Sequence, residues 1–349
     1  MFTALFVIVG LSILILSHEA GHFFAAKRLG LKVDEFGFGF PPRMFAWKKG
    51  ETEYSFNWLP FGGFVKIAGE NDRIQEGIEK LVSLPEEEKK RLFVFRPAWQ
   101  RTIVTIAGVF VNFVIGWILI ASILMIGTPQ AVVVSEVQKG SPAEVWGIES
   151  GDVIKNYLRS SDFISFVGEN RGKEIEISLQ RGKEVITIKV TPRIATTPGE
   201  GALGVLLAEA GEAQHGFFPA LWEGLKRTGL IFWATILTFY ELVKNLLIHG
   251  SLLGGVVGPV GIFGVAQQTG ELGFIYLVQL ISLISINLAA INLIPFPALD
   301  GGRLFLIIIE KMKGSPISLK TEAWVNGVGF VFLIFLMIII TIRDVSRWL

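Results

Sequence analysis

The sequence predicts a polytopic α-helical membrane protein with four spans, a membrane-associated β-segment and an inserted α+β domain. Two observations predict this class. Hydrophobic residues make up 51% of the 349-residue chain, and its mean hydropathy of +0.54 exceeds what soluble domains tolerate. Long charge-free runs also alternate with charged segments, and a bilayer core of about 30 Å takes roughly 20 apolar residues to cross.

The four predicted spans are residues 1–17 with the pentapeptide that follows them, 102–126, 274–299 and 323–342. A further apolar segment, 229–243, is shorter, contains Glu241 and is expected to lie in the membrane interface. The first span has no basic n-region and no A-x-A-like cleavage site. We therefore expect it to be retained rather than removed as a signal peptide.

The pentapeptide HEAGH at 18–22 is the strongest functional signal. Positions i and i+4 share a helix face, so His18 and His22 can bind one zinc ion while Glu19 contacts a water on that ion. The same motif also arises by chance in soluble helices, where the two histidines are merely solvated. An ionisable residue within an apolar helix favours the functional interpretation, because such groups are costly at membrane depth.

A third ligand is offered by the string NLIPFPALDGGR at 292–303, which places Asp300 at the end of the third span. Two histidines and a carboxylate leave one tetrahedral position of zinc open for water, as a catalytic site requires. The prediction is one Zn²⁺ per chain held by His18, His22 and Asp300, with Glu19 as the general base. Both helices must then run in the same direction, so segment 229–243 is expected not to cross.

Charge and composition set the orientation and exclude some partners. The positive-inside rule places the basic residues beside the spans in the cytoplasm, so both termini and the inserted domain face outside. Arg343 and Arg347 near the outer C-terminus oppose this trend. The net charge of +1 indicates no nucleic-acid partner, and the absence of cysteine excludes disulfides and a thiol nucleophile. The basic residues assigned to the inner side are Lys27, Arg28, Lys32, Arg96, Arg101, Lys311, Lys313 and Lys320.

These motifs resemble the site-2 protease family of intramembrane zinc metalloproteases, in its bacterial branch with PDZ modules. The likeness rests on HEAGH, on GPVGIFG at 258–264, on NLIPFPALDGG and on FRPAWQRTIVTIAG at 95–108. Asn112 matches the family pattern, whereas Val109 stands where the family commonly has proline after Gly108. The resemblance implies a multi-pass protein of the bacterial inner membrane. Its substrates would be single-pass transmembrane proteins, such as anti-sigma factors or remnant signal peptides, already trimmed outside the membrane.

The inserted domain, 127–208, contains the pattern SPAEVWGIESGD followed by alternating strands, and resembles a single PDZ domain. A PDZ groove captures an extended peptide by strand addition, and the resemblance implies that this domain screens substrates. The alternative is a small β-rich spacer. The sequence thus divides into a first membrane half, 1–126, the PDZ-like domain, and a second membrane half, 209–349, with an interfacial helix, a GPVGIFG loop and the last two spans.

The aromatic stretch 31–69 is predicted to form short strands separated by prolines and glycines. The resemblance implies a re-entrant β-structure with a free edge for substrate; a cytoplasmic β-meander packed on itself is the alternative. A charged segment after it is predicted to contain a helix over 85–93, with a capping box of Ser83 and Glu86.

A transmembrane substrate must be extended before cleavage, and its exposed amides then need partners in the bilayer. We expect the strand around 37–40 to pair with it, and two asparagine amides near the third span to bind it. Two prolines are expected to hold the enzyme's own helix open and aim Asp300. The predicted substrate-binding residues are Gly37, Phe38, Gly39, Asn287, Asn292, Pro295 and Pro297.

Three functions remain open from the sequence: an intramembrane endoprotease, a catalytically idle adaptor that holds partners through the PDZ-like domain, and a metal-dependent transporter. A transporter is expected to show internal repeats, and none is visible. An idle adaptor is expected to lack a ligand or the glutamate, yet His18, Glu19, His22 and Asp300 are all present. The sequence therefore favours the protease.

Overall fold

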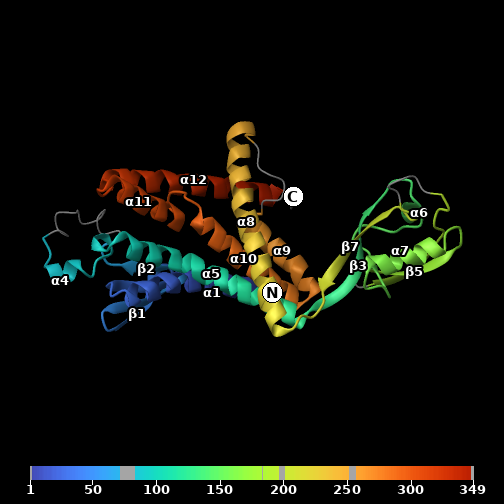
Figure 1. Ribbon diagram of the computed structural model, residues 1–349, viewed down its shortest axis with the longest axis horizontal. Helices are drawn as coiled ribbons and strands as arrows, with labels where there is room; N and C mark the ends of the chain where they lie inside the picture. Colours follow the sequence, from blue (N-terminus) through green and yellow to red (C-terminus); the bar gives the residue numbers. More distant parts are fainter. Residues whose placement is uncertain (1, 71–82, 183, 196–200, 251–256, 347–349) are drawn as a thin grey trace. The chain divides into compact units, whose positions relative to one another are not determined.

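The computed structural model describes residues 2–70, 83–182, 184–195, 201–250 and 257–346. The chain divides into two compact units (Figure 1). The membrane unit consists of residues 1–121 and 221–349, and the inserted unit of residues 122–220.

Five of the described helices are long and apolar enough to cross a membrane. They are α1 (Phe2–Arg28), α5 (Ala98–Ile126), α8 (Phe217–His249), α10 (Phe274–Leu293) and α12 (Leu319–Ser346). Four of them coincide with the predicted spans, and the prediction of a multi-pass helical membrane protein is confirmed at this level. Helix α1 continues without interruption through HEAGH, so the two histidines are four residues apart on a regular helix.

Contacts along the helices fix their directions. The rings of Phe6 and Phe274 lie 5.3 Å apart near the starts of α1 and α10, and the ends of both helices approach Asp300, so the two run parallel. Helix α5 runs the opposite way: its first turns pack beside the end of α1, and the backbone carbonyl of Asn112 accepts a hydrogen bond of 2.8 Å from Ser285 in the middle of α10.

A short helix, α9 (Pro259–Leu272), lies between the end of α12 and the start of α1. The backbone N–H groups of Gly258 and Gly261 donate to one carboxylate oxygen of Asp344, at 2.9 and 2.8 Å, near the end of α12. At its other end Gly270 lies beside Thr3 at the start of α1. The prediction of a loop at GPVGIFG is therefore wrong, because Gly258 directly precedes helix α9. The carboxylate of Asp344 stabilises the amino end of this helix, as the helix dipole favours.

Helix α8 is much longer than the predicted interfacial segment 229–243, extending over 33 residues. Its start lies against the end of α5, where the indole N–H of Trp117 donates to the carbonyl of Leu221 at 2.8 Å. In Figure 1 it runs in a different direction from α1, α5 and α12. The predicted segment was too short because charged residues that form ion pairs along the helix, such as Glu241 with Lys244, reduce the hydropathy of the sequence. These residues do not end the helix.

Helix α10 ends at Leu293, and Asp300 is the first residue of a new helix, α11 (Asp300–Lys313). The expectation that Asp300 ends a membrane helix is therefore wrong, because α10 ends before Asp300 and Asp300 begins the next helix. The physical reason lies in Pro295 and Pro297, since proline lacks an N–H donor and excludes the helical conformation at the residue before it.

The β-segment forms one sheet from two long bent strands, β1 (Val33–Lys49) and β2 (Thr52–Ile67), rather than many short ones. Register shifts bend each strand into two stretches. The four stretches lie side by side in the sheet in the order 43–49, 52–57, 33–38 and 63–67. Phe38 thus pairs with both Phe56 and Gly63. The expectation that the strand around 37–40 offers a free edge is wrong, because the backbone groups of Gly37 and Phe38 have neighbours on both sides.

The predicted helix over 85–93 is reduced to two short pieces, α4 (Glu86–Lys89) and the 3₁₀ turn η1 (Phe93–Phe95). Pro85 precedes α4 and no side chain caps it, so the expected capping box of Ser83 and Glu86 is not formed.

The inserted unit contains a five-stranded antiparallel sheet in the order β6-β5-β4-β3-β7, with helices α6 (Pro142–Val145) and α7 (Ser160–Glu169). The last strand continues to Glu212, past the expected boundary at 208. Buried Asp152 receives two hydrogen bonds of 2.8 Å from Arg181, which hold the pKa of its carboxyl below the ordinary range. The strands of the unit are β3 (Thr128–Val137), β4 (Val153–Ile154), β5 (Ile175–Arg181), β6 (Glu184–Val190) and β7 (Val205–Glu212).

Candidate metal centre

His18, His22 and Asp300 converge on one point inside the membrane unit. The Nε2 atoms of the histidines lie 3.2 Å apart, and Oδ2 of Asp300 is 3.0 Å from the first and 3.3 Å from the second. Both histidines are buried, with 8% of their surface exposed. Three potential ligand atoms that come from distant parts of the chain therefore form a compact triangle.

The spacing of this triangle fits a tetrahedral zinc ion. Ligand atoms about 2.0–2.1 Å from such an ion are about 3.3 Å from one another, close to the three distances found here. Two nitrogens and one carboxylate oxygen are also donors that zinc prefers in catalytic sites, where a fourth position stays open. His18, His22 and Asp300 are the residues that would hold the metal, and they are the three residues for which the sequence made this prediction.

A hydrogen bond to the backbone of α5 fixes the ring of His22. Its Nδ1 lies 2.7 Å from the carbonyl oxygen of Val104. Because a carbonyl can only accept, Nδ1 carries the proton, and the lone pair on Nε2 is directed toward the metal position. Such partners of the second ring nitrogen orient metal-binding histidines and increase their basicity.

Two glycines let α1 and α5 approach closely at the site. A Cβ atom on Gly21 would lie 2.5 Å from the carbonyl oxygen of Ala107, and one on Gly108 would lie 2.8 Å from Cε1 of His18 and closer still to Nε2 of His22. Membrane helices use small residues for such close contacts. Gly108 is therefore the residue that leaves room for the two imidazoles.

Asp300 reaches the histidines because the chain turns sharply before α11. Ala298 adopts a left-handed conformation with φ of 69°, which is uncommon for a residue with a Cβ atom and strains the backbone. Its N–H faces the Asn326 side chain at 3.3 Å, and Gly329 packs against Pro297, so α12 supports the turn. At the start of α11, the helix dipole favours an ionised carboxylate.

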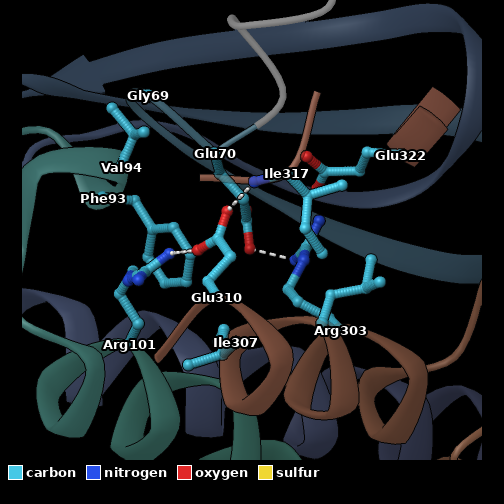
Figure 2. A pocket seen from close by; sticks show the side chains of 11 residues that line it. Gly69, Glu70, Phe93, Val94, Arg101, Arg303, Ile307, Glu310, Ile317 and Glu322 are labelled. Atoms are coloured by element: carbon cyan, nitrogen blue, oxygen red, sulfur yellow. Dashed lines mark hydrogen bonds and ion pairs between the residues drawn. The ribbon is translucent and has the colours of Figure 1, made fainter. Parts of the chain in front are cut away.

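Two ion pairs hold α11 against α5 and the β-segment (Figure 2). Arg101 at the start of α5 donates to Glu310 at 2.7 Å, with both side chains less than 15% exposed. Arg303, one turn after Asp300, pairs with Glu70 at the end of the β-segment. Glu310 also accepts from the backbone N–H of Ile317. The helix that supplies Asp300 is thus tied to α5, to the β-segment and to the chain leading into α12.

A cavity of about 250 Å³ opens onto the metal position. Besides two of the metal ligands it is lined by Glu19, by two asparagines, and by apolar side chains. Glu19 also lies beside the β-segment, since a Cβ atom on Gly63 would be 3.4 Å from its Cγ. The residues around the cavity are Ile15, His18, Glu19, Asn112, Leu288, Asn292, Ala298, Leu299 and Asp300.

The predicted substrate-binding residues lie in four different places. Asn292 lines the cavity, as expected of a residue near the reacting atoms. Asn287 does not line it; its side-chain oxygen accepts a hydrogen bond of 2.8 Å from Thr235 of α8. Pro295 and Pro297 lie in the break between α10 and α11. Gly37, Phe38 and Gly39 lie in the sheet, with the first two paired on both sides.

Sequence reasoning missed several residues that shape the site. The carbonyl of Val104 and the conformation of Ala298 leave no signature in residue type, because any residue offers a carbonyl. Gly108 and Asn112 were noted only as part of a family pattern, although their spacing of four places them on one face of α5. The spacing would have been the available signal once α5 was recognised as packing on α1.

Comparisons with known proteins agree on one family. The family model for peptidase family M50 matches residues 6–336. A Clostridium perfringens protein whose name describes a zinc metalloprotease is 34% identical over 348 residues, covering 98% of each chain. The Regulator of sigma-W protease RasP of Bacillus subtilis is 28% identical over 414 aligned positions, covering 96% of each. The zinc metalloprotease RasP of Oceanobacillus iheyensis is 30% identical over 432 positions, covering 99% of each.

The close contact at Gly108 predicts that Gly108→Ala impairs metal binding. The added Cβ would press on His22 and His18, so zinc affinity should fall about 10–100-fold, as it does when the support of a ligand is lost. Zinc per chain, measured by elemental analysis of purified protein during dialysis against a chelator, checks this. Gly229→Ala on α8 is the matched control, because an added Cβ there meets nothing within 4 Å. Equal zinc retention in both variants would contradict the prediction.

Proposed function

This chain belongs to peptidase family M50, the zinc metalloproteases of site-2 type, and we propose that it hydrolyses single-pass transmembrane proteins within the bilayer. The observation that supports this best is the triangle of His18, His22 and Asp300 inside a bundle of apolar helices. One relative is named Regulator of sigma-W protease RasP. Anti-sigma factors or remnant signal peptides, trimmed beforehand outside the membrane, are the proposed substrates.

The proposed reaction is hydrolysis with Glu19 as the base. A zinc ion held by the three ligands would polarise the scissile carbonyl and lower the pKa of water bound to it. Glu19 takes a proton from the attacking water as the water oxygen bonds to the carbonyl carbon, and it later delivers that proton to the leaving amine nitrogen as the C–N bond breaks. Glu19 lines the cavity together with His18, so a water and a substrate carbonyl held in this cavity would lie beside its carboxylate.

Substituting Glu19→Gln tests this assignment. The amide cannot accept the proton, so cleavage should fall by a factor of about 10²–10⁴, while zinc stays near one per chain. Cleavage of a purified single-pass substrate in detergent, followed by gel mobility, measures the first quantity, and elemental analysis the second. Cleavage at a rate within threefold of the unaltered enzyme would show that Glu19 is not the base.

We further propose that the chain crosses the membrane four times, with α1, α5, α10 and α12, and that α8 does not cross. Helix α9 lies between the end of α12 and the start of α1, and its 14 residues are too few to span. If α8 crossed inward, the nine residues from His249 to Gly258 would have to return outward. Fully extended they reach roughly 30 Å, with backbone groups unpaired in lipid.

The absence of cysteine allows this topology to be tested by single substitutions. Ser83→Cys should be shielded from a membrane-impermeant maleimide in intact cells, whereas Glu184→Cys in the inserted unit should be labelled. His249→Cys at the exposed end of α8 should be labelled as well. Labelling of His249→Cys only after the cells are opened, together with Ser83→Cys, would mean that α8 crosses.

We propose that substrate pairs with the edge of the sheet at 63–67 rather than with the central stretch at 33–38. Among the described residues, the stretch 63–67 has a ladder partner on one side only. It also lies close to the base, because a Cβ atom on Gly63 would lie 3.4 Å from Cγ of Glu19. An extended peptide that pairs with this edge would lie about 4.8 Å from it, with its backbone groups hydrogen-bonded to the strand. The peptide would then pass beside the metal position.

Cross-linking tests which edge is used. In the Glu19→Gln background, which keeps the substrate whole, Lys66→Cys should be joined by a short bismaleimide to a single cysteine beside the scissile bond of the substrate. Trp47→Cys, exposed on the opposite edge, is the matched control and should remain unlinked. A stronger cross-link at Trp47 would place the substrate on the wrong side of the sheet for this proposal.

For the inserted unit we propose a PDZ-like role in screening substrates. A groove of about 440 Å³ runs between α7 and β7, an edge strand of the sheet, and is lined by apolar side chains such as Phe163 and Leu203. An extended peptide can add to such an edge. Glu209 binds the backbone N–H and hydroxyl of Ser160, linking β7 to the start of α7.

A further inference from the structure

We propose that Asn112 is a catalytic residue whose side-chain amide donates a hydrogen bond to the oxygen of the scissile carbonyl as negative charge develops there. The inference rests on the proposed hydrolysis with Glu19 as base. It adds a donor from α5, the helix that faces the metal-binding helix α1, and it assigns a role to a side chain that the metal centre does not otherwise use.

Asn112 is buried and unpaired beside the metal position. It is fully inaccessible to solvent, and neither its amide nitrogen nor its amide oxygen has a hydrogen-bond partner. Among the described residues it is the only side chain with two buried atoms in this condition. It lines the same cavity as His18, Glu19 and Asp300. A buried polar group without a partner costs stability, and such groups concentrate where a ligand or substrate supplies the missing partner.

Other polar side chains at this depth of the membrane unit are satisfied by neighbouring helices. Asn287 accepts from Thr235 of α8, and Ser285 donates to the backbone carbonyl of Asn112 itself. Membrane helices commonly use asparagine in this way. Asn112 therefore lacks the ordinary structural reason for a buried amide, although helices that could bind it pack around it.

The backbone around Asn112 is held on two sides, which fixes its position relative to the reacting atoms. One turn earlier, Gly108 touches both zinc-binding histidines. The hydrogen bond from buried Ser285 attaches the backbone of Asn112 to α10. A donor held in place before reaction needs no reorganisation when charge appears, and this is the property that makes oxyanion-stabilising groups effective.

The electron flow of the reaction favours a hydrogen-bond donor beside the carbonyl, in addition to the polarisation that a bound zinc ion would supply. As the water oxygen bonds to the carbonyl carbon, the π pair of the C=O bond moves onto its oxygen, while Glu19 holds the proton from water. The charged groups on the cavity, Glu19 and Asp300, are carboxylates that cannot donate when ionised, and the histidines are committed to the metal. An amide N–H of Asn112 is a neutral donor that stays protonated throughout the cycle.

The test uses the full-length, zinc-loaded enzyme with Asn112→Leu and Asn112→Asp. For both variants kcat on a single-pass model substrate should fall about 10²–10³-fold, the effect of removing one oxyanion donor, while KM changes less than threefold. Affinity for a phosphinic peptide, which mimics the tetrahedral carbon, should fall by a similar factor. Binding of the intact substrate in the Glu19→Gln background should be unchanged, and zinc should stay near one per chain.

A stability measurement separates this role from a structural one. Leucine removes the unpaired amide, so zinc-free Asn112→Leu should unfold at the same temperature as the zinc-free unaltered chain or at a higher one. A lower unfolding temperature for both variants together with loss of zinc would assign Asn112 to structure and overturn the proposal. A raised KM with unchanged kcat would also overturn it, because the residue would then bind the ground state.

The outcome also distinguishes this inference from the proposed function. Cleavage by the unaltered enzyme, none by Glu19→Gln and full cleavage by both Asn112 variants would refute only the role of Asn112. Failure of the unaltered zinc-loaded enzyme to cleave any single-pass substrate would refute the proposed function instead.

Discussion

The close crossing of α1 and α5 is the constraint on which the metal centre depends. Gly21 and Gly108 allow two backbones to approach so near that the carbonyl of Val104 reaches the His22 ring, at 2.7 Å. In lipid the hydrophobic effect does not hold helices together, so packing and interhelical hydrogen bonds must. The same contacts that join the two helices thus also set the tautomer and direction of the His22 ring, a candidate zinc ligand. A change in either glycine would alter packing and chemistry together.

The third ligand comes from a different kind of element and is positioned by different forces. Asp300 starts a helix after a strained turn, and that turn is supported by α12 through Asn326 and Gly329. Beyond it, the ion pairs of Glu310 with Arg101 and of Arg303 with Glu70 hold α11 against α5 and the β-segment. Breaking a buried pair is costly, about 3–5 kcal/mol, because one charge is left without a partner. The carboxylate therefore sits on a helix anchored from both directions.

How much of this could be predicted from the sequence depended on whether the signal was local. Long charge-free runs predicted the four spans, and the spacing of His18 and His22 predicted a shared ligand face. The pairing of Asp300 with them followed from matching helix ends, although the exact element was wrong. Prediction failed where the outcome depends on distant partners: the length of α8, and the register that places 33–38 in the middle of its sheet. Strand order is decided by tertiary contacts that residue pattern does not contain.

The role proposed for Asn112 could not be predicted from the sequence either. From sequence alone, an asparagine in a membrane helix has an ordinary explanation, a hydrogen bond to a neighbouring helix. Only the arrangement of α1, α5 and α10 reveals that its neighbours have used their polar groups elsewhere, Ser285 on a backbone carbonyl and His22 on Val104. A satisfied amide would have stabilised the bundle. An amide without a partner at the metal position can instead donate its hydrogen bond to a group of the substrate. The stability that the resting protein lacks is then regained as interaction energy during the reaction.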